Sequence, residues 1–201
     1  MQEWIVDIVR QLGPFGIGLL MLLENVLPPI PSEIIMPLAG FLSENGGTPF
    51  WTAVGAGVTG ATVGALGWYA LARRIGRDRL MGFADGRGRW IGIDRDGLER
   101  AHAWFTRHSG RAVFFGRLVP GLRTFISVPA GFTAMPFTTF LLYTFTGTAI
   151  WSAALAFAGL LLGRRFEVVE QYIGIVSWVV VGAALLMWVW RIVRLWRRAA
   201  D

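Results

Sequence analysis

The sequence contains no cysteine and no lysine, and its long apolar runs carry very few acids. Without cysteine the chain can form no disulfide, no thiolate nucleophile and no cysteine-ligated metal site. All nineteen basic residues are arginine, which we attribute to a GC-rich genome rather than to function. The chain has a net charge of +6, and its basic residues lie between hydrophobic runs. They form no basic surface with interleaved aromatic residues of the kind that stack on nucleic-acid bases. We therefore expect no nucleic-acid partner.

Long uncharged runs place the 201-residue chain among membrane proteins. Hydrophobic residues make up 54% of it, and its mean hydropathy is +0.53. Residues 50–72, 137–163 and 170–192 are each apolar over about the 20 residues that a spanning helix needs. Residues 4–23 are a fourth candidate, whose first turns carry two charges and suit an amphipathic helix at the interface. The sequence thus predicts an all-α membrane protein with about four transmembrane helices.

The charged loops predict the orientation of the chain. Its start carries acids and lacks both a basic region and a cleavage site, so we expect no removable signal peptide. Residues 73–110 form an arginine-rich linker, and residues 193–201 form an arginine-rich tail. Because basic loops favour the cytoplasm, we expect the linker and both termini to be cytoplasmic. In this topology Arg164 and Arg165 lie on the outer side of the membrane, which is contrary to the tendency of basic residues to be cytoplasmic.

Within the linker, apolar positions recur at helical spacing and predict an amphipathic cytoplasmic helix on the inner leaflet. We expect this helix to begin near Asp94 or Asp96 and to stop at Gly110. His102 and His108 lie on it. Two histidines without other well-placed ligands do not indicate a metal site, so no metal is expected.

Two apolar segments are broken by proline and glycine. Residues 24–48 hold four prolines, and residues 111–134 contain the pair Pro120 and Gly121. Proline interrupts a continuous helix. Irregular backbone at membrane depth survives only where protein or a water-filled cavity surrounds it. Both segments therefore predict re-entrant hairpins.

The two hairpins carry opposite charges at similar positions. Glu24 and Glu33 lie on the first, and Arg117 and Arg123 lie on the second. Ionisable side chains inside a membrane are costly and commonly mark a transport pathway. We expect these four to meet and form the working site, although they could also serve only to join the hairpins. Further polar lining is expected from Asn25, Ser32, Pro120, Gly121, Thr124 and Ser127.

The two halves of the chain resemble each other in order and spacing. The segment Pro37 to Phe41 (PLAGF) is matched by Pro129 to Phe132 (PAGF), and Pro49-Phe50 is matched by Pro136-Phe137. An arginine pair follows at the same distance in each half. In the expected topology the first hairpin dips from outside and the second from inside, which makes the halves inverted repeats. Transporters built in this way bind substrate near the midplane, at the repeat interface.

At these residues the sequence resembles the DedA family, whose shared region is called the VTT or SNARE-associated domain. The resemblance is carried by LENVLPPIPSEIIMPLAG (Leu23 to Gly40) and FFGRLVPGLRT (Phe114 to Thr124), and it covers most of the chain. It implies a single membrane domain over residues 1–201, with its two halves at residues 1–72 and 111–163. It also implies an acidic pair on the first re-entrant hairpin and an arginine pair on the second. The positions that match are Glu24, Glu33, Arg117 and Arg123.

The PPIPSE variant of the first motif resembles the subgroup associated with recycling undecaprenyl phosphate across the bacterial cytoplasmic (inner) membrane. We therefore expect a transporter or flippase for an anionic lipid, most closely a polyprenyl phosphate. Arginine matches phosphate oxygens in a bidentate fork, and the acids would occupy the arginines in the empty state. Burial favours a neutral carboxyl whereas a neighbouring arginine favours the charged form, which makes proton coupling a further hypothesis.

Other functions stay open from the sequence alone. A phospholipid scramblase or a proton-coupled ion or drug exporter could use the same charges. A membrane lipid phosphatase is disfavoured, because neither hairpin holds a histidine or a cysteine. We expect no enzymatic activity and no cofactor other than protons, while small-residue helix faces permit a homodimer.

Overall fold

The computed structural model describes residues 3–26, 32–44, 46–85 and 95–162, and every regular element within these ranges is a helix. The predicted last span at residues 170–192, the tail and the second arginine pair lie outside the described residues. The helices are, in chain order, α1 (Glu3–Val26), α2 (Ser32–Glu44), α3 (Phe50–Asp85), α4 (Arg95–Arg117), α5 (Leu122–Phe125), α6 (Ser127–Phe132) and α7 (Phe137–Leu162). The prediction of an all-α protein is confirmed for this part of the chain.

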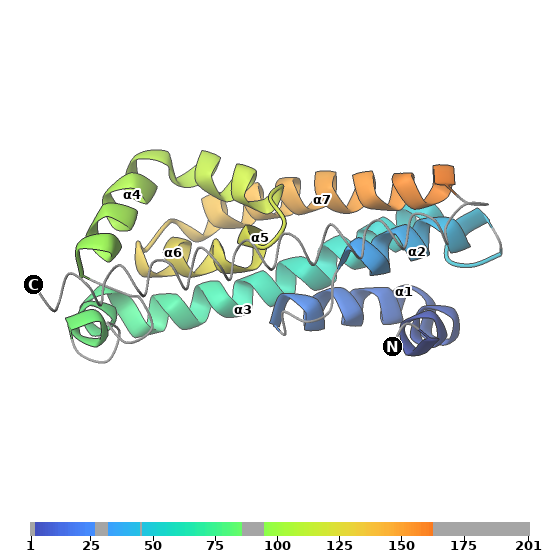
Figure 1. Ribbon diagram of the computed structural model, residues 1–201, viewed down its shortest axis with the longest axis horizontal. Helices are drawn as coiled ribbons and strands as arrows, with labels where there is room; N and C mark the ends of the chain where they lie inside the picture. The colour runs from blue at the N-terminus through green and yellow to red at the C-terminus, as the bar shows by residue number, and fades with distance from the viewer. Residues whose placement is uncertain (1–2, 27–31, 45, 86–94, 163–201) are drawn as a thin grey trace, which may run out of the picture.

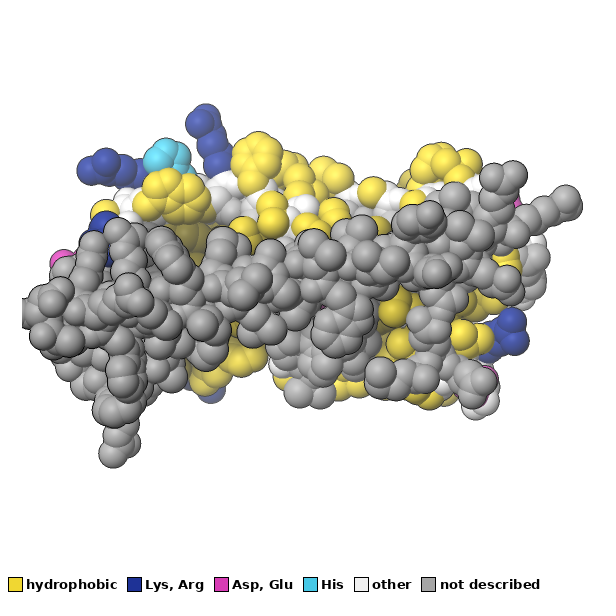
Figure 2. Space-filling view, in the orientation of Figure 1, with side chains coloured by type: hydrophobic (Ala, Val, Ile, Leu, Met, Phe, Trp, Pro, Cys, Tyr) yellow, Lys and Arg dark blue, Asp and Glu magenta, His cyan; other side chains and the backbone are white. Residues whose placement is uncertain are grey.

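Three of the described helices are long and apolar enough to cross a membrane. These stretches are Trp4–Val26 in α1, Phe50–Gly76 in α3 and Phe137–Leu161 in α7. Their outer faces expose large apolar side chains, among them Trp51 at 76% and Leu161 at 68%. Figure 2 shows such hydrophobic side chains along α7. Extensive apolar exposure of this kind fits a surface that contacts lipid.

The later part of α1 runs beside α3 in the same direction (Figure 1). Gly60 contacts the backbone of Gly18, and Gly64 contacts Asn25, so neither glycine has room for a side chain. α1 bends at Gly13, whose φ of 54° lies in the left-handed region that favours glycine. Because Gly64 is near the middle of the apolar part of α3, α1 ends at about half the depth of that span.

This arrangement separates the N-terminus from the linker. The first turns of α1 lie at the end of the molecule where α3 begins, whereas α3 ends and α4 begins at the opposite end (Figure 1). The sequence predicted that the N-terminus and the linker are both cytoplasmic. If α3 crosses the membrane once between them, they lie on opposite sides; the cytoplasmic position of the N-terminus stays a prediction.

Within the predicted first hairpin, residues 24–48, the described chain is helical at residues 24–26 and 32–44. Glu24 is still helical in α1, and α2 continues through Pro37 to its end without interruption. Gly159 of α7 packs directly on the carbonyl of Pro37. The intervening residues 27–31 are not described.

In the second half, α4 does not stop at Gly110, as the sequence predicted, but continues to Arg117. Its one non-helical residue is His108. The ring of Tyr143 lies where a Cβ of residue 110 would be, so this glycine serves helix packing and not helix termination. The predicted break at the following proline and glycine is confirmed. The chain turns at Gly121 (φ 80°) and then forms the short helices α5 and α6.

Reciprocal contacts join the two halves in the way the internal repeat suggests. Gly40 of α2 packs on the backbone of Ala156 in α7, and Gly131 of α6 packs on the backbone of Tyr69 in α3. The two glycines are equivalent in the repeat, and Tyr69 and Ala156 lie equally far along α3 and α7. These two helices run in opposite directions along the long axis (Figure 1), as inverted repeats require. Whether the hairpins re-enter a membrane stays a prediction.

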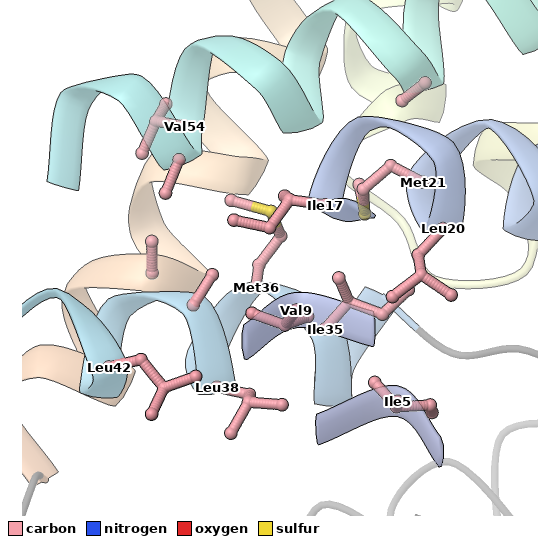
Figure 3. Close-up of a cluster of buried hydrophobic side chains, with 14 of the residues drawn as sticks. Ile5, Val9, Ile17, Leu20, Met21, Ile35, Met36, Leu38, Leu42 and Val54 are labelled. Atoms are coloured by element: carbon pink, nitrogen blue, oxygen red, sulfur yellow. The ribbon is translucent and has the colours of Figure 1, made fainter. Parts of the chain in front are cut away.

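Two apolar cores lie toward the two ends of the molecule. The first packs α1, α2 and the start of α3 against α7, around Ile17 and Met36 (Figure 3). The second packs the later part of α3 against α4, α6 and the start of α7, where the rings of Tyr69 and Phe140 stack at 4.3 Å. On α3 the first core ends before Gly64 and the second begins after it. The ends of α1, α2, α4 and α5 meet in the region between these cores (Figure 1).

Candidate functional site

Arg123 is the centre of a buried group of polar side chains between the two cores. The turn at Gly121 leads directly into α5, which places Arg123 in the interior with 8% of its surface exposed. Its guanidinium donates hydrogen bonds to Glu24 Oε1 and to Ser32 Oγ. The Oε2 atom of Glu33 lies 3.6 Å from Nη2 of the same guanidinium. One side chain therefore joins α5 to the end of α1 and the start of α2.

The two acids differ in their environment. Glu24 is buried, with 5% of its surface exposed, whereas Glu33 is only half-buried. Oε2 of Glu24 has no hydrogen-bond partner among the described residues, and neither has Oδ1 of the neighbouring Asn25. The carbonyl of Asn25 accepts a hydrogen bond of 2.9 Å from the indole of Trp68. Glu24 is thus the principal acid of the group, and it retains an unused acceptor.

Arg117 plays a different part from Arg123. It is the last residue of α4 and has 2% of its surface exposed. Its guanidinium donates to the carbonyl oxygen of Arg123 at 2.5 Å and to Ser127 Oγ at 2.7 Å, while its Nε has no partner among the described residues. Neither acid forms an ion pair with it in the described part of the chain. We expected the acids to pair with both arginines, but among the described residues both acids pair with Arg123 alone.

The remaining predicted lining residues fall into two groups. Ser32 and Ser127 are fully buried and accept hydrogen bonds from the arginines. Gly121 is exposed and Pro120 and Thr124 are half-buried, so these three lie at the edge of the site. The backbone amides that follow the turn are already used, because those of residues 122 and 123 both donate to the carbonyl of residue 119, at 3.2 and 3.3 Å.

This geometry can exchange one anion for another. Each hydrogen-bonding position that Arg123 gives to the carboxylate of Glu24 is one that a phosphate oxygen could take. The group holds two carboxylates and two guanidiniums, so an entering anion creates excess negative charge unless an acid moves away or binds a proton. Among the described residues, no three histidine, aspartate or glutamate side chains come together in a way that could hold a metal ion.

Apolar helices of spanning length around a buried charged site are typical of membrane transporters. Residues 30–161 match the VTT domain, and the chain belongs to the VTT, or DedA, family. The family membership predicted from the two motifs is therefore confirmed. No solved structure matches the chain at a significant level.

Several curated relatives cover most of the chain. It is 36% identical over 166 residues to the undecaprenyl phosphate transporter A of Staphylococcus aureus, covering 83% of this chain and 82% of the relative. The Bacillus subtilis protein of the same name is 31% identical over 170 residues, covering 85% and 82%. An alkaline phosphatase-like protein of Lactococcus lactis is 35% identical over 182 residues, covering 90% and 85%. The names of the S. aureus and B. subtilis relatives agree with a membrane transporter rather than an enzyme.

Sequence reasoning missed two residues that shape the site. Trp68 anchors the end of α1 through the carbonyl of Asn25. Gly147 of α7 lies under Arg117, where a Cβ would approach the arginine Cβ at 2.8 Å. The sequence held a signal for Gly147, because Gly60 and Gly147 occupy equivalent positions in the repeat. Each lets another helix approach closely, α1 at Gly60 and α4 at Gly147.

Proposed function

We propose that this protein moves an anionic lipid with a phosphate headgroup, most closely undecaprenyl phosphate, across the bacterial cytoplasmic membrane. The observation that carries the proposal is the buried Arg123 guanidinium, bonded at once to Glu24 and Ser32 from the opposite hairpin. A phosphate that replaced the carboxylate would receive the same two-pronged donor. The names of the S. aureus and B. subtilis relatives support this substrate.

In the proposed cycle Glu24 occupies Arg123 while the site is empty. An entering phosphate displaces the carboxylate, which then takes up a proton because a buried, unpaired charge is costly. Arg117 holds the α5 backbone in place while this exchange occurs. Protons are in this view the coupling ion, no other cofactor takes part, and the two hairpins form gates that re-enter the membrane from opposite sides.

The test is lipid translocation in proteoliposomes that contain either undecaprenyl phosphate or a fluorescent phospholipid. We expect the wild type to move undecaprenyl phosphate, and Arg123→Gln to lose most of this activity. Glu44→Gln on α2 is the matched control, because Glu44 is an exposed acid on the same helix as Glu33. Equal movement of both lipids would favour a scramblase. A well-folded wild type that moves neither lipid would overturn the proposal and leave a proton-driven exporter as the better account.

Proton coupling has its own test in the same vesicles. A pH gradient of one sign should accelerate undecaprenyl phosphate movement, and a protonophore should abolish the acceleration. Glu24→Gln should make the rate insensitive to the gradient, because the residue that exchanges the proton is gone. A gradient response that survives this substitution would place the proton elsewhere.

A further inference from the structure

A row of buried hydroxyl groups runs along α7, apart from the four charged residues. Thr144, Thr148 and Ser152 follow one another every fourth residue, and 0%, 6% and 0% of their surfaces are exposed. Side chains four residues apart lie on one face of a helix. The helix carries no charge, and its other threonines, Thr138, Thr139 and Thr146, are half-buried or exposed. A polar face inside such a helix therefore needs an explanation.

The hydroxyls at the two ends of this row are not satisfied. Oγ1 of Thr144 and Oγ of Ser152 have no hydrogen-bond partner among the described residues. Threonine in a helix usually donates to the carbonyl four residues earlier. Thr146, which is partly exposed on the other side of α7, does this at 2.8 Å to the carbonyl of Leu142. The buried hydroxyls are thus directed away from their own backbone, although the usual partner was within reach.

One edge of this row lies beside the charged site. Gly147 follows Thr144 by three residues and is therefore its neighbour on the helix surface, and a Cβ on Gly147 would meet Arg117 Cβ at 2.8 Å and Cγ at 3.4 Å. Nε of Arg117 is also unpartnered among the described residues. The row extends for about 12 Å along the helix axis. It begins beside the charged site and leads away from it along α7.

We propose that Thr144, Thr148 and Ser152 form the track along which the phosphate headgroup travels to and from the arginines. This inference rests on the proposed function and adds the path to the binding site. Each hydroxyl can donate to a phosphate oxygen, and neighbours one turn apart are about 5–6 Å from each other. A headgroup that leaves one donor therefore meets the next before it has lost all its hydrogen bonds. In this structure the track is closed, because Thr144 and Ser152 are fully buried and their hydroxyls meet no partner among the described residues.

The experiment compares the triple variant Thr144→Val/Thr148→Val/Ser152→Ala with the wild type in proteoliposomes containing undecaprenyl phosphate. These substitutions remove the hydroxyls and nearly keep the volumes. We expect the translocation rate to fall by about tenfold, the loss expected for one hydrogen bond to a charged group. Thr146→Val is the matched control on the same helix and should keep the wild-type rate.

Thermal unfolding in detergent separates the track from a structural role. Removing an unpartnered buried hydroxyl relieves a desolvated polar group, so the triple variant should have an unchanged or higher Tm. A lower Tm, together with a rate loss that follows the loss of folded protein, would overturn the track. A wild-type rate in the triple variant would also overturn the track but leave the proposed function intact. If the wild type itself moves no phosphate lipid, both proposals fail.

Discussion

A buried arginine and glutamate rarely give a protein the most stable interior it could have. The cost of removing both charges from water often exceeds their attraction, and apolar replacements can be more stable. The chain nevertheless surrounds Arg123 with Glu24 and Ser32 and leaves one oxygen of the acid unpartnered among the described residues. Such an arrangement is easier to explain by a ligand that replaces the acid than by stability alone.

The first prediction concerns the free energy of the Arg123–Glu24 pair. Arg123→Gln leaves the carboxylate buried without its partner, so we expect the unfolding free energy to fall by about 3–5 kcal/mol. The double variant Arg123→Gln/Glu24→Gln should recover most of that loss, because neither charge is then stranded. Unfolding of the three proteins in one detergent measures this. If the double variant is as unstable as the single one, the ion pair is not the dominant interaction.

The second prediction tests Arg117 as a positioning residue. Its two outer nitrogens donate to the carbonyl of Arg123 and to Ser127, and a lysine has only one nitrogen for both acceptors. We expect Arg117→Lys to slow lipid translocation by about tenfold although the charge is kept. Arg111→Lys, at an exposed arginine of the same helix, is the control. Full activity of Arg117→Lys would mean that only its charge matters.

The sequence predicted that these charged side chains lie together but not which of them are partners. Glu24, Arg117 and Arg123 could be chosen as candidates because they are charged residues inside apolar segments broken by proline or glycine. A charge at membrane depth needs a compensating partner. Which arginine meets which acid depends on the rotation of short helices, and residue spacing does not determine it. One contact was available in advance. Ser32 and Arg123 each lie eight residues before the glycine of their repeat, and the structure joins them by a hydrogen bond.

At the scale of helices, glycine explains where the two halves can approach. The third prediction is that Gly40→Ala and Gly131→Ala each lower stability by about 1–3 kcal/mol or more, because the new Cβ would overlap a backbone carbonyl of the other half. Gly67→Ala is the control, since no atom lies within 4 Å of its Cβ position. There we expect a gain of about 0.5–1 kcal/mol from the stiffer backbone. Measured Tm values that are equal for all three would contradict the reciprocal packing.

The helices were predicted more reliably than their ends. Long apolar runs found α3 and α7 because a spanning helix leaves a strong compositional signal. Proline and glycine misled in two places, at Pro37 and Gly110, where each lies inside a helix. In both cases the residue meets a neighbouring helix, Gly159 on Pro37 and Tyr143 on Gly110. From the local sequence alone, proline and glycine are interpreted as helix breakers. At these two positions their role is instead to contact a helix that is distant in the sequence.

At the scale of the molecule, the inverted repeat places the site. Each half sends a short hairpin to about mid-depth along the long helix of its own half, and each hairpin then packs on the long helix of the other half. The charged residues lie where the end of α1 and the start of α2 meet α5 and the end of α4. Under the proposed function, motion of one half against the other is the way in which such inverted repeats give alternating access.

The last prediction tests the depth of α1 through the side of the membrane on which its first turns lie. Because α1 accompanies only the first half of α3, residues near Gln11 should lie on the side opposite to Arg79, beyond the end of the apolar part of α3. The chain has no native cysteine, so Gln11→Cys and Arg79→Cys can each be labelled alone. With a membrane-impermeant maleimide on intact cells, we expect Gln11→Cys to react and Arg79→Cys to react only after permeabilisation. Arg79 is assigned to the cytoplasmic side because the arginine-rich linker favours the cytoplasm. Reaction of both only after permeabilisation would show that α1 is a full span and would restore the cytoplasmic N-terminus that the sequence predicted.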